Sequence, residues 1–114
     1  MQTDGKMLIE DWKKQSAIIA ELFHQKAYQE ARVPMEKYTK QFIHTLFILN
    51  KKEWLEGEDF LDNIQTFKYK PLNIKERIQY VIEYPHQYHC FIQLNELYKE
   101  VEKIYARAEI LEKK

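Results

Sequence analysis

Residues 90–111 read CFIQLNELYKEVEKIYARAEIL, and this stretch decides the fold. Its apolar residues recur at alternating steps of four and three, a spacing that places them along one side of a helix. The main seam consists of Cys90, Leu94, Leu97, Val101, Ile104, Ala108 and Leu111, and it is widened by Phe91, Tyr98 and Tyr105. A helix of about 25 residues is roughly 38 Å long, whereas a compact domain of this size is about 26 Å across. The sequence therefore predicts a long C-terminal helix that extends beyond the elements it packs against.

Four further helices are expected upstream. Apolar residues at helical spacing mark residues 7–32, 34–50, 60–67 and 74–84. Pro34 is expected to end the first helix and open the second, and Pro85 to open the last, because proline suits the first turn of a helix but not its interior. Asn73, with Glu76 three residues later, resembles a capping box before the fourth helix. The buried stripe of that helix is expected to be Ile74, Ile78, Val81 and Ile82.

The composition supports one compact all-α bundle of about five helices. The 114 residues are 45% hydrophobic and 32% charged, which is a single-domain length with enough apolar residues for a core. Two glycines and three prolines leave too few turn-forming residues for a sheet of many strands. We therefore expect a single helical domain over residues 1–114, with fraying ends at 1–6 and 112–114.

Charge, cysteine content and hydropathy indicate the expected environment. Eighteen basic and eighteen acidic residues give a formal net charge of zero, so the chain as a whole does not attract nucleic acid or an acidic membrane. The lone cysteine, Cys90, cannot form an intrachain disulfide, which fits a reducing compartment. The longest apolar run, residues 46–49, is far shorter than the ~20 residues of a membrane span, and the first residues lack a signal-peptide pattern. We expect a soluble cytoplasmic protein that does not bind a membrane.

No residue pattern in the sequence indicates an enzyme. His86, His89 and Cys90 combine groups that suit zinc, but no second cluster supplies a fourth ligand. The acidic stretch at residues 53–65 lacks the spacing of a calcium loop or of a dimetal site. Ser16, the single serine, belongs to no nucleophile motif. The sequence therefore predicts no catalytic residue, no metal site and no cofactor, and a metal or catalytic role for His86 and His89 is the least favoured hypothesis.

Aromatic and charged residues near the expected connectors favour a protein-binding surface. Tyr, Phe and Trp make up 14% of the chain, and not all of them fit inside so small a bundle. The residues expected to contact a partner are Trp54, Tyr69, Lys70, Asn73, Arg77, Tyr84, Tyr88 and Glu96. Two alternatives stay open: the rings plug the ends of the bundle, and Arg77 forms a structural ion pair with a carboxylate such as Glu100.

Two basic segments make nucleic acid the alternative partner. Residues 34–52 and 66–77 each carry four cations and one acid, a net charge of plus three, and Phe67 and Tyr69 can stack on bases. The cations are Lys37, Lys40, Lys51, Lys52, Lys68, Lys70, Lys75 and Arg77. The acidic stretch lies between the two segments, and so few cations give weak, salt-sensitive binding. Nucleic acid is therefore less favoured than a protein partner.

Three short motifs resemble the YpoC-like family of small bacterial proteins. They are KPLNIKER at residues 70–77, Tyr84-Pro85, and QLNELYKE at residues 93–100. Leu46-Phe47 with Asn50 resembles the upstream segment of the family, so the match covers roughly residues 40–106. The resemblance implies an all-helical cytoplasmic protein of low-GC Gram-positive bacteria. It carries over no activity and no catalytic residue.

We therefore expect a non-enzymatic helical interaction module. Its binding surface is expected at the 66–77 connector and the adjoining ends of the fourth and fifth helices. The overhanging turns from Ile104 to Leu111 also favour a homodimer. The sequence identifies no particular partner protein.

Overall fold

The computed structural model describes residues 4–55 and 59–113, and every regular element within them is an α-helix. The helices are α1 (Gly5–His24), α2 (Tyr28–Leu49), α3 (Phe60–Gln65), α4 (Ile74–Glu83) and α5 (Tyr88–Leu111). This confirms the predicted all-α class and the long C-terminal helix. None of these described helices is long and apolar enough to span a membrane.

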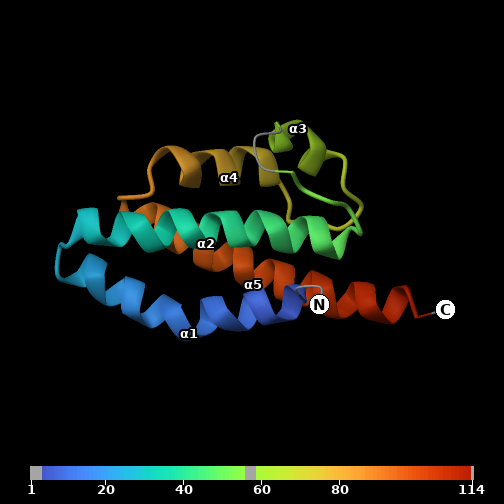
Figure 1. Ribbon diagram of the computed structural model, residues 1–114, viewed down its shortest axis with the longest axis horizontal. Coiled ribbons are helices and arrows are strands. Elements are labelled where there is room, and N and C mark those ends of the chain that lie inside the picture. The colour runs from blue at the N-terminus through green and yellow to red at the C-terminus, as the bar shows by residue number, and fades with distance from the viewer. Residues whose placement is uncertain (1–3, 56–58, 114) are drawn as a thin grey trace.

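Three long helices form the body of the bundle, and two short helices cover one side of it (Figure 1). α1 and α2 form an antiparallel pair, and α5 lies along both of them. α4 packs on α2 and α5, and α3 packs against α4. The molecule measures 48 × 28 × 27 Å, and the C-terminal turns of α5 extend past the other helices, as expected.

The first helix break lies at Lys26, not at Pro34. The Lys26 N–H donates to the Phe23 carbonyl oxygen (3.0 Å), and the Ala27 N–H donates to the Leu22 carbonyl oxygen (2.8 Å). These two bonds form a Schellman motif, and Lys26 has the left-handed φ (61°) that the motif requires. The expected break at Pro34 is therefore wrong. Pro34 lies inside α2, in its second turn, where its missing N–H removes one backbone hydrogen bond.

Asn73 precedes α4 without forming the expected capping box. Its backbone is left-handed (φ 57°), and its side chain makes no capping hydrogen bond. The prediction is wrong because a residue whose side chain caps a helix has an extended backbone, whereas Asn73 is left-handed; its carbonyl oxygen still accepts the Arg77 N–H (3.2 Å). Side-chain caps occur instead at Asp4 and Asp59, whose carboxylates each accept a backbone N–H two residues later. The last helix begins at Tyr88, three residues after the expected Pro85.

Side chains near both described ends of the chain contact other parts of the bundle. α1 already begins at Gly5, and Lys6 forms an ion pair with Glu109 of α5 (2.7 Å). At the other end, Glu112 accepts a hydrogen bond from the Tyr69 hydroxyl (2.9 Å). Residues 1–3 and 114 lie outside the described part of the chain.

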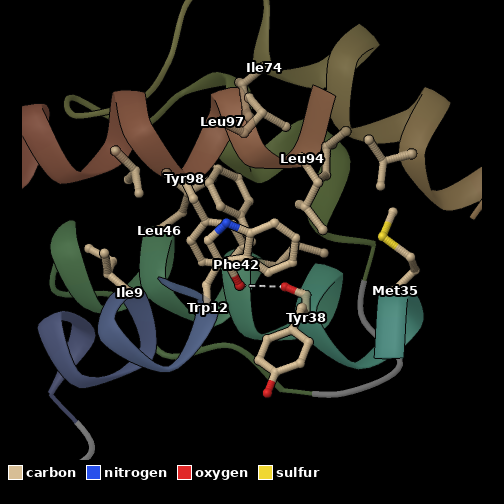
Figure 2. Packing of buried hydrophobic residues seen from close by; sticks show 14 of the residues in the cluster. Ile9, Trp12, Met35, Tyr38, Phe42, Leu46, Ile74, Leu94, Leu97 and Tyr98 are labelled. Atoms are coloured by element: carbon tan, nitrogen blue, oxygen red, sulfur yellow. Dashed lines mark hydrogen bonds between the residues drawn. The ribbon is translucent and has the colours of Figure 1, made fainter. Parts of the chain in front are cut away.

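Aromatic rings at the centre of the bundle join α1, α2 and α5 (Figure 2). Trp12 is 2% exposed and stacks on Tyr98 with ring centroids 4.7 Å apart. Phe42 meets the Tyr98 ring edge-on (5.2 Å). The Tyr98 hydroxyl donates to the Tyr38 carbonyl oxygen (2.5 Å), so the buried phenol is paired. Each such ring pair adds about 0.5–1.5 kcal/mol to the free energy of burial, which fixes how the three long helices pack.

The expected apolar stripes of α4 and α5 are buried, with three exceptions. The seam of α5 is buried at Cys90, Leu94, Leu97, Val101 and Ala108. Ile104 is half-buried, and Leu111, in the last turn of α5, is 54% exposed. In α4, the expectation that Ile82 is buried is wrong: it is 41% exposed at the edge of the helix that faces α2.

Candidate interaction site

The residues expected to bind a partner lie in separate places. They are Trp54 after α2; Tyr69, Lys70 and Asn73 in the connector between α3 and α4; Arg77 and Tyr84 on and after α4; and Tyr88 and Glu96 on α5. Arg77 lies near enough to Glu96 for the carboxylate to raise the arginine pKa. Tyr88 instead contacts Phe23 of α1, with ring centroids 5.9 Å apart. The structure therefore does not gather the whole set into one surface.

The connector between α3 and α4 is fixed by the side chain of Asn50. The Asn50 amide donates to the Leu46 and Tyr69 carbonyl oxygens (both 2.8 Å), and the Tyr69 N–H donates back to Asn50 Oδ1 (2.9 Å). The Tyr69 hydroxyl donates to Glu112 at the end of α5 (2.9 Å). This bond, with Lys68 beside it, lowers the pKa of the Glu112 carboxyl below its usual value. Tyr69 thus joins the ends of α2 and α5.

Arg77 directs its guanidinium at partners within the molecule. Its Nη1 donates to the Leu72 carbonyl oxygen and to Glu100 (both 2.9 Å), and its Nη2 donates to the second Glu100 oxygen. With the Gln93 amide oxygen turned towards Arg77, that oxygen accepts from Nη2 (2.9 Å) and Nε (2.8 Å). The hydrogen bonds to Glu100 raise the pKa of Arg77. All five N–H groups are engaged, so the structural ion pair with Glu100 is the role that the structure gives Arg77.

The two basic segments approach each other around Glu112. The Lys68 Nζ lies 3.6 Å from the Glu112 carboxylate, and Lys51 is close enough to help lower the pKa of that group. Lys75 pairs with Asp62 of α3 (3.0 Å). The other cations of the two segments are Lys37 and Lys40 on α2, Lys52 after it, and Lys70 in the connector. Lys68 and Lys75 are therefore each paired with a carboxylate of the molecule itself.

Among the described residues, no further metal ligands lie beside the histidines near the start of α5. Within residues 4–55 and 59–113, no three His, Cys, Asp or Glu side chains are placed to hold a metal ion. His86 Nδ1 is buried without a hydrogen-bond partner among the described residues, and His89 is exposed. Cys90 is buried, which raises its pKa to about 11, and its S–H donates to the Tyr80 carbonyl oxygen (3.5 Å). Such a thiol is a core residue and a poor nucleophile. Residues 56–58 of the acidic stretch lie outside the described residues.

A groove between α2 and α4, here called the α2–α4 groove, is the feature that the sequence analysis missed. Its cavity has a volume of about 280 Å³. It is lined by Glu36, Thr39, Lys40 and Ile43 of α2, by Trp54, by Phe60 of α3, and by Val81, Ile82 and Pro85 at the end of α4. The α2 residues share one side of the helix because they are three, four and seven positions apart. The lining is mostly apolar, and the 41% exposure of Ile82 shows that the groove reaches solvent.

Trp54 forms an aromatic wall of the α2–α4 groove. Its ring lies 4.5 Å from that of His44, 5.9 Å from that of Phe47 and 5.6 Å from that of Phe60, between centroids. Its indole N–H is buried and has no hydrogen-bond acceptor among the described residues. A buried donor without an acceptor costs about 1–3 kcal/mol, so this wall is held by ring packing and not by a hydrogen bond. Trp54 is the residue that the predicted partner set shares with the groove.

Comparison with known proteins identifies a family. The family model described as YpoC-like protein matches residues 2–113. A curated relative from Bacillus subtilis (strain 168), named Uncharacterized protein YpoC, is 46% identical over 39 residues. That alignment covers 34% of this chain and 24% of the relative, which is about a quarter of the relative's length. No solved structure matches the chain. Because the family model spans residues 2–113, the chain belongs to the YpoC-like protein family.

Proposed function

We propose that the protein is a non-enzymatic interaction module whose α2–α4 groove receives an amphipathic helix of a partner protein. The observation that carries the proposal is an apolar groove that opens to solvent at Ile82. The intramolecular contacts of Arg77 and Tyr69 support this groove over the 66–77 connector as the binding surface. Both side chains already hold elements of the bundle together, so a partner would have to displace those contacts.

The length of the groove suits a short helix. Its α2 wall from Glu36 to Ile43 is about 10 Å long at 1.5 Å per residue. Val33, which is 72% exposed one turn before Glu36, extends the apolar surface to about 15 Å. That is the length of a helix of about ten residues.

The walls of the groove favour a helix as the occupant. α2 and α4 lie side by side, so the groove follows their direction (Figure 1). A third helix can place one apolar side between two such helices by the packing that joins helices elsewhere in the bundle. Glu36 and Lys40 add one acid and one base to the lining, and Glu36 is paired with Arg32 of the same helix (3.0 Å).

The test uses a displayed library of amphipathic helical peptides selected on the wild-type protein. The affinity of each selected peptide is then measured for Ile82→Asp and for the control Ile92→Asp. The two isoleucines have matched exposure, 41% and 40%, but Ile92 lies on α5 outside the groove. We expect Ile82→Asp to weaken binding at least tenfold, because it places a charge in the apolar wall, and Ile92→Asp to leave it unchanged.

Two results would contradict the proposal. One is a library that yields no binder to the wild type. The other is a set of binders that Ile82→Asp and Ile92→Asp affect equally while both variants keep the wild-type circular dichroism spectrum. Phe60→Ala changes the lining of the groove without adding a charge. Weaker peptide binding in this variant too would show that the effect of Ile82→Asp is not specific to a charge at position 82.

A further inference from the structure

We propose that a hollow at one end of the bundle binds a nucleotide. It is formed by the last turns of α1, the turn to α2 and the start of α5, and is here called the end hollow. That turn lies opposite the start of α1 and the end of α5 (Figure 1). The volume is about 730 Å³, within the usual range of about 300–1,000 Å³ for small-molecule sites. The lining includes Ala20, Glu21, His24, Lys26, Tyr28 and Tyr88, none of which lines the α2–α4 groove, so the proposal does not depend on that groove.

Two tyrosines give the end hollow an accessible aromatic surface. Tyr28, the first residue of α2, is 43% exposed, and Tyr88, the first residue of α5, is 50% exposed. Both rings lie beside that of the buried Phe23, with centroids 6.3 and 5.9 Å from it. The packing on Phe23 positions the two side chains, and their exposed parts are available to a ligand. Bases stack on such rings, so this surface suits the planar part of a nucleotide.

Lys26 supplies a cation that has no carboxylate partner among the described residues. Its backbone is left-handed (φ 61°), a conformation that glycine adopts freely and that is unfavourable for a residue with a Cβ. Lys51 has a similar backbone (φ 57°), but it lies near the Glu112 carboxylate. Non-glycine residues in this conformation are found at ligand-binding sites, which favours a ligand-binding role for the Lys26 side chain. Its ammonium suits the phosphate of a nucleotide.

His24 and Glu21 complete the polar side of the end hollow. They lie three residues apart on α1, so both side chains reach the same side of the helix. The His24 imidazole forms no hydrogen bond with a described residue, and its N–H can donate to a phosphate oxygen. Glu21 accepts one hydrogen bond, from Gln25 (3.1 Å), which leaves acceptor positions for hydroxyl groups.

The carboxylate narrows the class of ligand. Glu21 disfavours a simple aromatic anion, because it would face the anion without a donor between them. It favours a ligand that also offers hydroxyl groups, as a ribose does. A nucleotide brings together the three matching parts: a base for the tyrosines, hydroxyl groups for Glu21 and a phosphate for Lys26 and His24.

The test is an NMR titration of the uniformly ¹⁵N-labelled chain with AMP, adenosine and ribose 5-phosphate. We expect AMP to shift the backbone amides of His24, Lys26, Tyr28 and Tyr88 saturably. Adenosine lacks the phosphate and ribose 5-phosphate lacks the base, so each should bind at least tenfold more weakly than AMP.

Two pairs of variants test whether AMP binds in the end hollow. Lys26→Gly removes the ammonium, and Lys51→Gly makes the same change at the end of α2, outside the hollow. Tyr88→Ala removes one exposed ring of the hollow, and Tyr84→Ala removes a ring of similar exposure (40%) outside it. Lys26→Gly and Tyr88→Ala should each weaken AMP binding at least tenfold, whereas the two controls should leave it unchanged. Because glycine suits the backbone at position 26, Lys26→Gly should lose affinity without unfolding more easily.

The proposal is overturned by any of three results. They are no saturable shift with AMP, equal affinity for AMP and either fragment, or equal effects of Lys26→Gly and Lys51→Gly on AMP binding. If Tyr88→Ala does not fold, the lysine pair decides the outcome. A tetra-adenylate RNA distinguishes the source of the nucleotide: tighter binding than AMP assigns the end hollow to single-stranded RNA, and equal or weaker binding assigns it to a free nucleotide.

Discussion

Replacing Lys26 by glycine is predicted to stabilise the protein. Lys26 ends α1 at φ 61°, and Lys51 ends α2 in the same way at φ 57°. A residue with a Cβ loses about 1–2 kcal/mol in this left-handed conformation, whereas glycine adopts it freely. Glycine in turn loses about 0.5–1 kcal/mol of additional backbone entropy on folding. The difference predicts that Lys26→Gly raises the free energy of unfolding by about 0.5–1 kcal/mol.

Lys51→Gly should give a smaller gain than Lys26→Gly. The Lys51 N–H donates to the Ile48 carbonyl oxygen (3.0 Å), which shows that it fills the corresponding position of a second Schellman motif. However, Lys51 also lies near the Glu112 carboxylate and helps lower its pKa. Glycine removes that attraction, so part of the backbone gain is lost.

Urea unfolding followed by far-UV circular dichroism measures these differences. The control is Lys37→Gly in the interior of α2, where glycine should lower the free energy of unfolding by about 1 kcal/mol. The expected order of stability is Lys26→Gly, Lys51→Gly, wild type, Lys37→Gly. If Lys26→Gly loses as much stability as Lys37→Gly, the Schellman assignment at the end of α1 is refuted.

Three further predictions follow from close contacts and shifted pKa values. Gly5→Ala places its Cβ 2.6 Å from Tyr105 Cε2, so urea unfolding should show that the free energy of unfolding falls by about 1 kcal/mol. The same change in a Tyr105→Ala background should instead raise the free energy of unfolding. Tyr69→Phe removes the main hydrogen bond to Glu112, so an NMR titration should show the Glu112 pKa rising towards 4.5. A carboxyl whose pKa is lowered by folding stabilises the protein above its unfolded pKa, and this contribution is lost as the pH falls. The stability advantage of wild type over Tyr69→Phe should therefore shrink below pH 4.5. Cys90, with a pKa near 11, should react with a thiol reagent at neutral pH after unfolding, and immediate reaction of the native protein would contradict its burial.

The helices that the sequence predicted correctly are those whose apolar spacing is regular. Residues 90–101 place a buried side chain at every step of the heptad pattern, so the spacing predicts the long last helix. The break between α1 and α2 did not follow, because it rests on Lys26, a residue type that rarely adopts a left-handed conformation. Pro34, the residue that usually marks such a break, is instead accommodated within α2.

The candidate sites depend on contacts between helices, which the order of residues does not contain. The 66–77 connector was a reasonable choice from its aromatic and basic residues, but the bonds from Arg77 to Glu100 and from Tyr69 to Glu112 join positions far apart in the chain. The sequence contains one indication of the α2–α4 groove, in the adjacent positions of Val81 and Ile82. Ile82 follows Val81 directly, so the two cannot both point to the centre of a helix stripe, and one of them had to lie at its edge.

The most direct test of the proposed interaction role is chemical-shift mapping with the tightest peptide from the library and uniformly ¹⁵N-labelled protein. We expect the largest shifts on residues 33–43, on Trp54 and Phe60, and on residues 81–85, which surround the α2–α4 groove. Shifts confined to the 66–77 connector would contradict the proposed groove and would place the binding surface at the connector. Shifts spread evenly over the bundle would contradict any single binding surface.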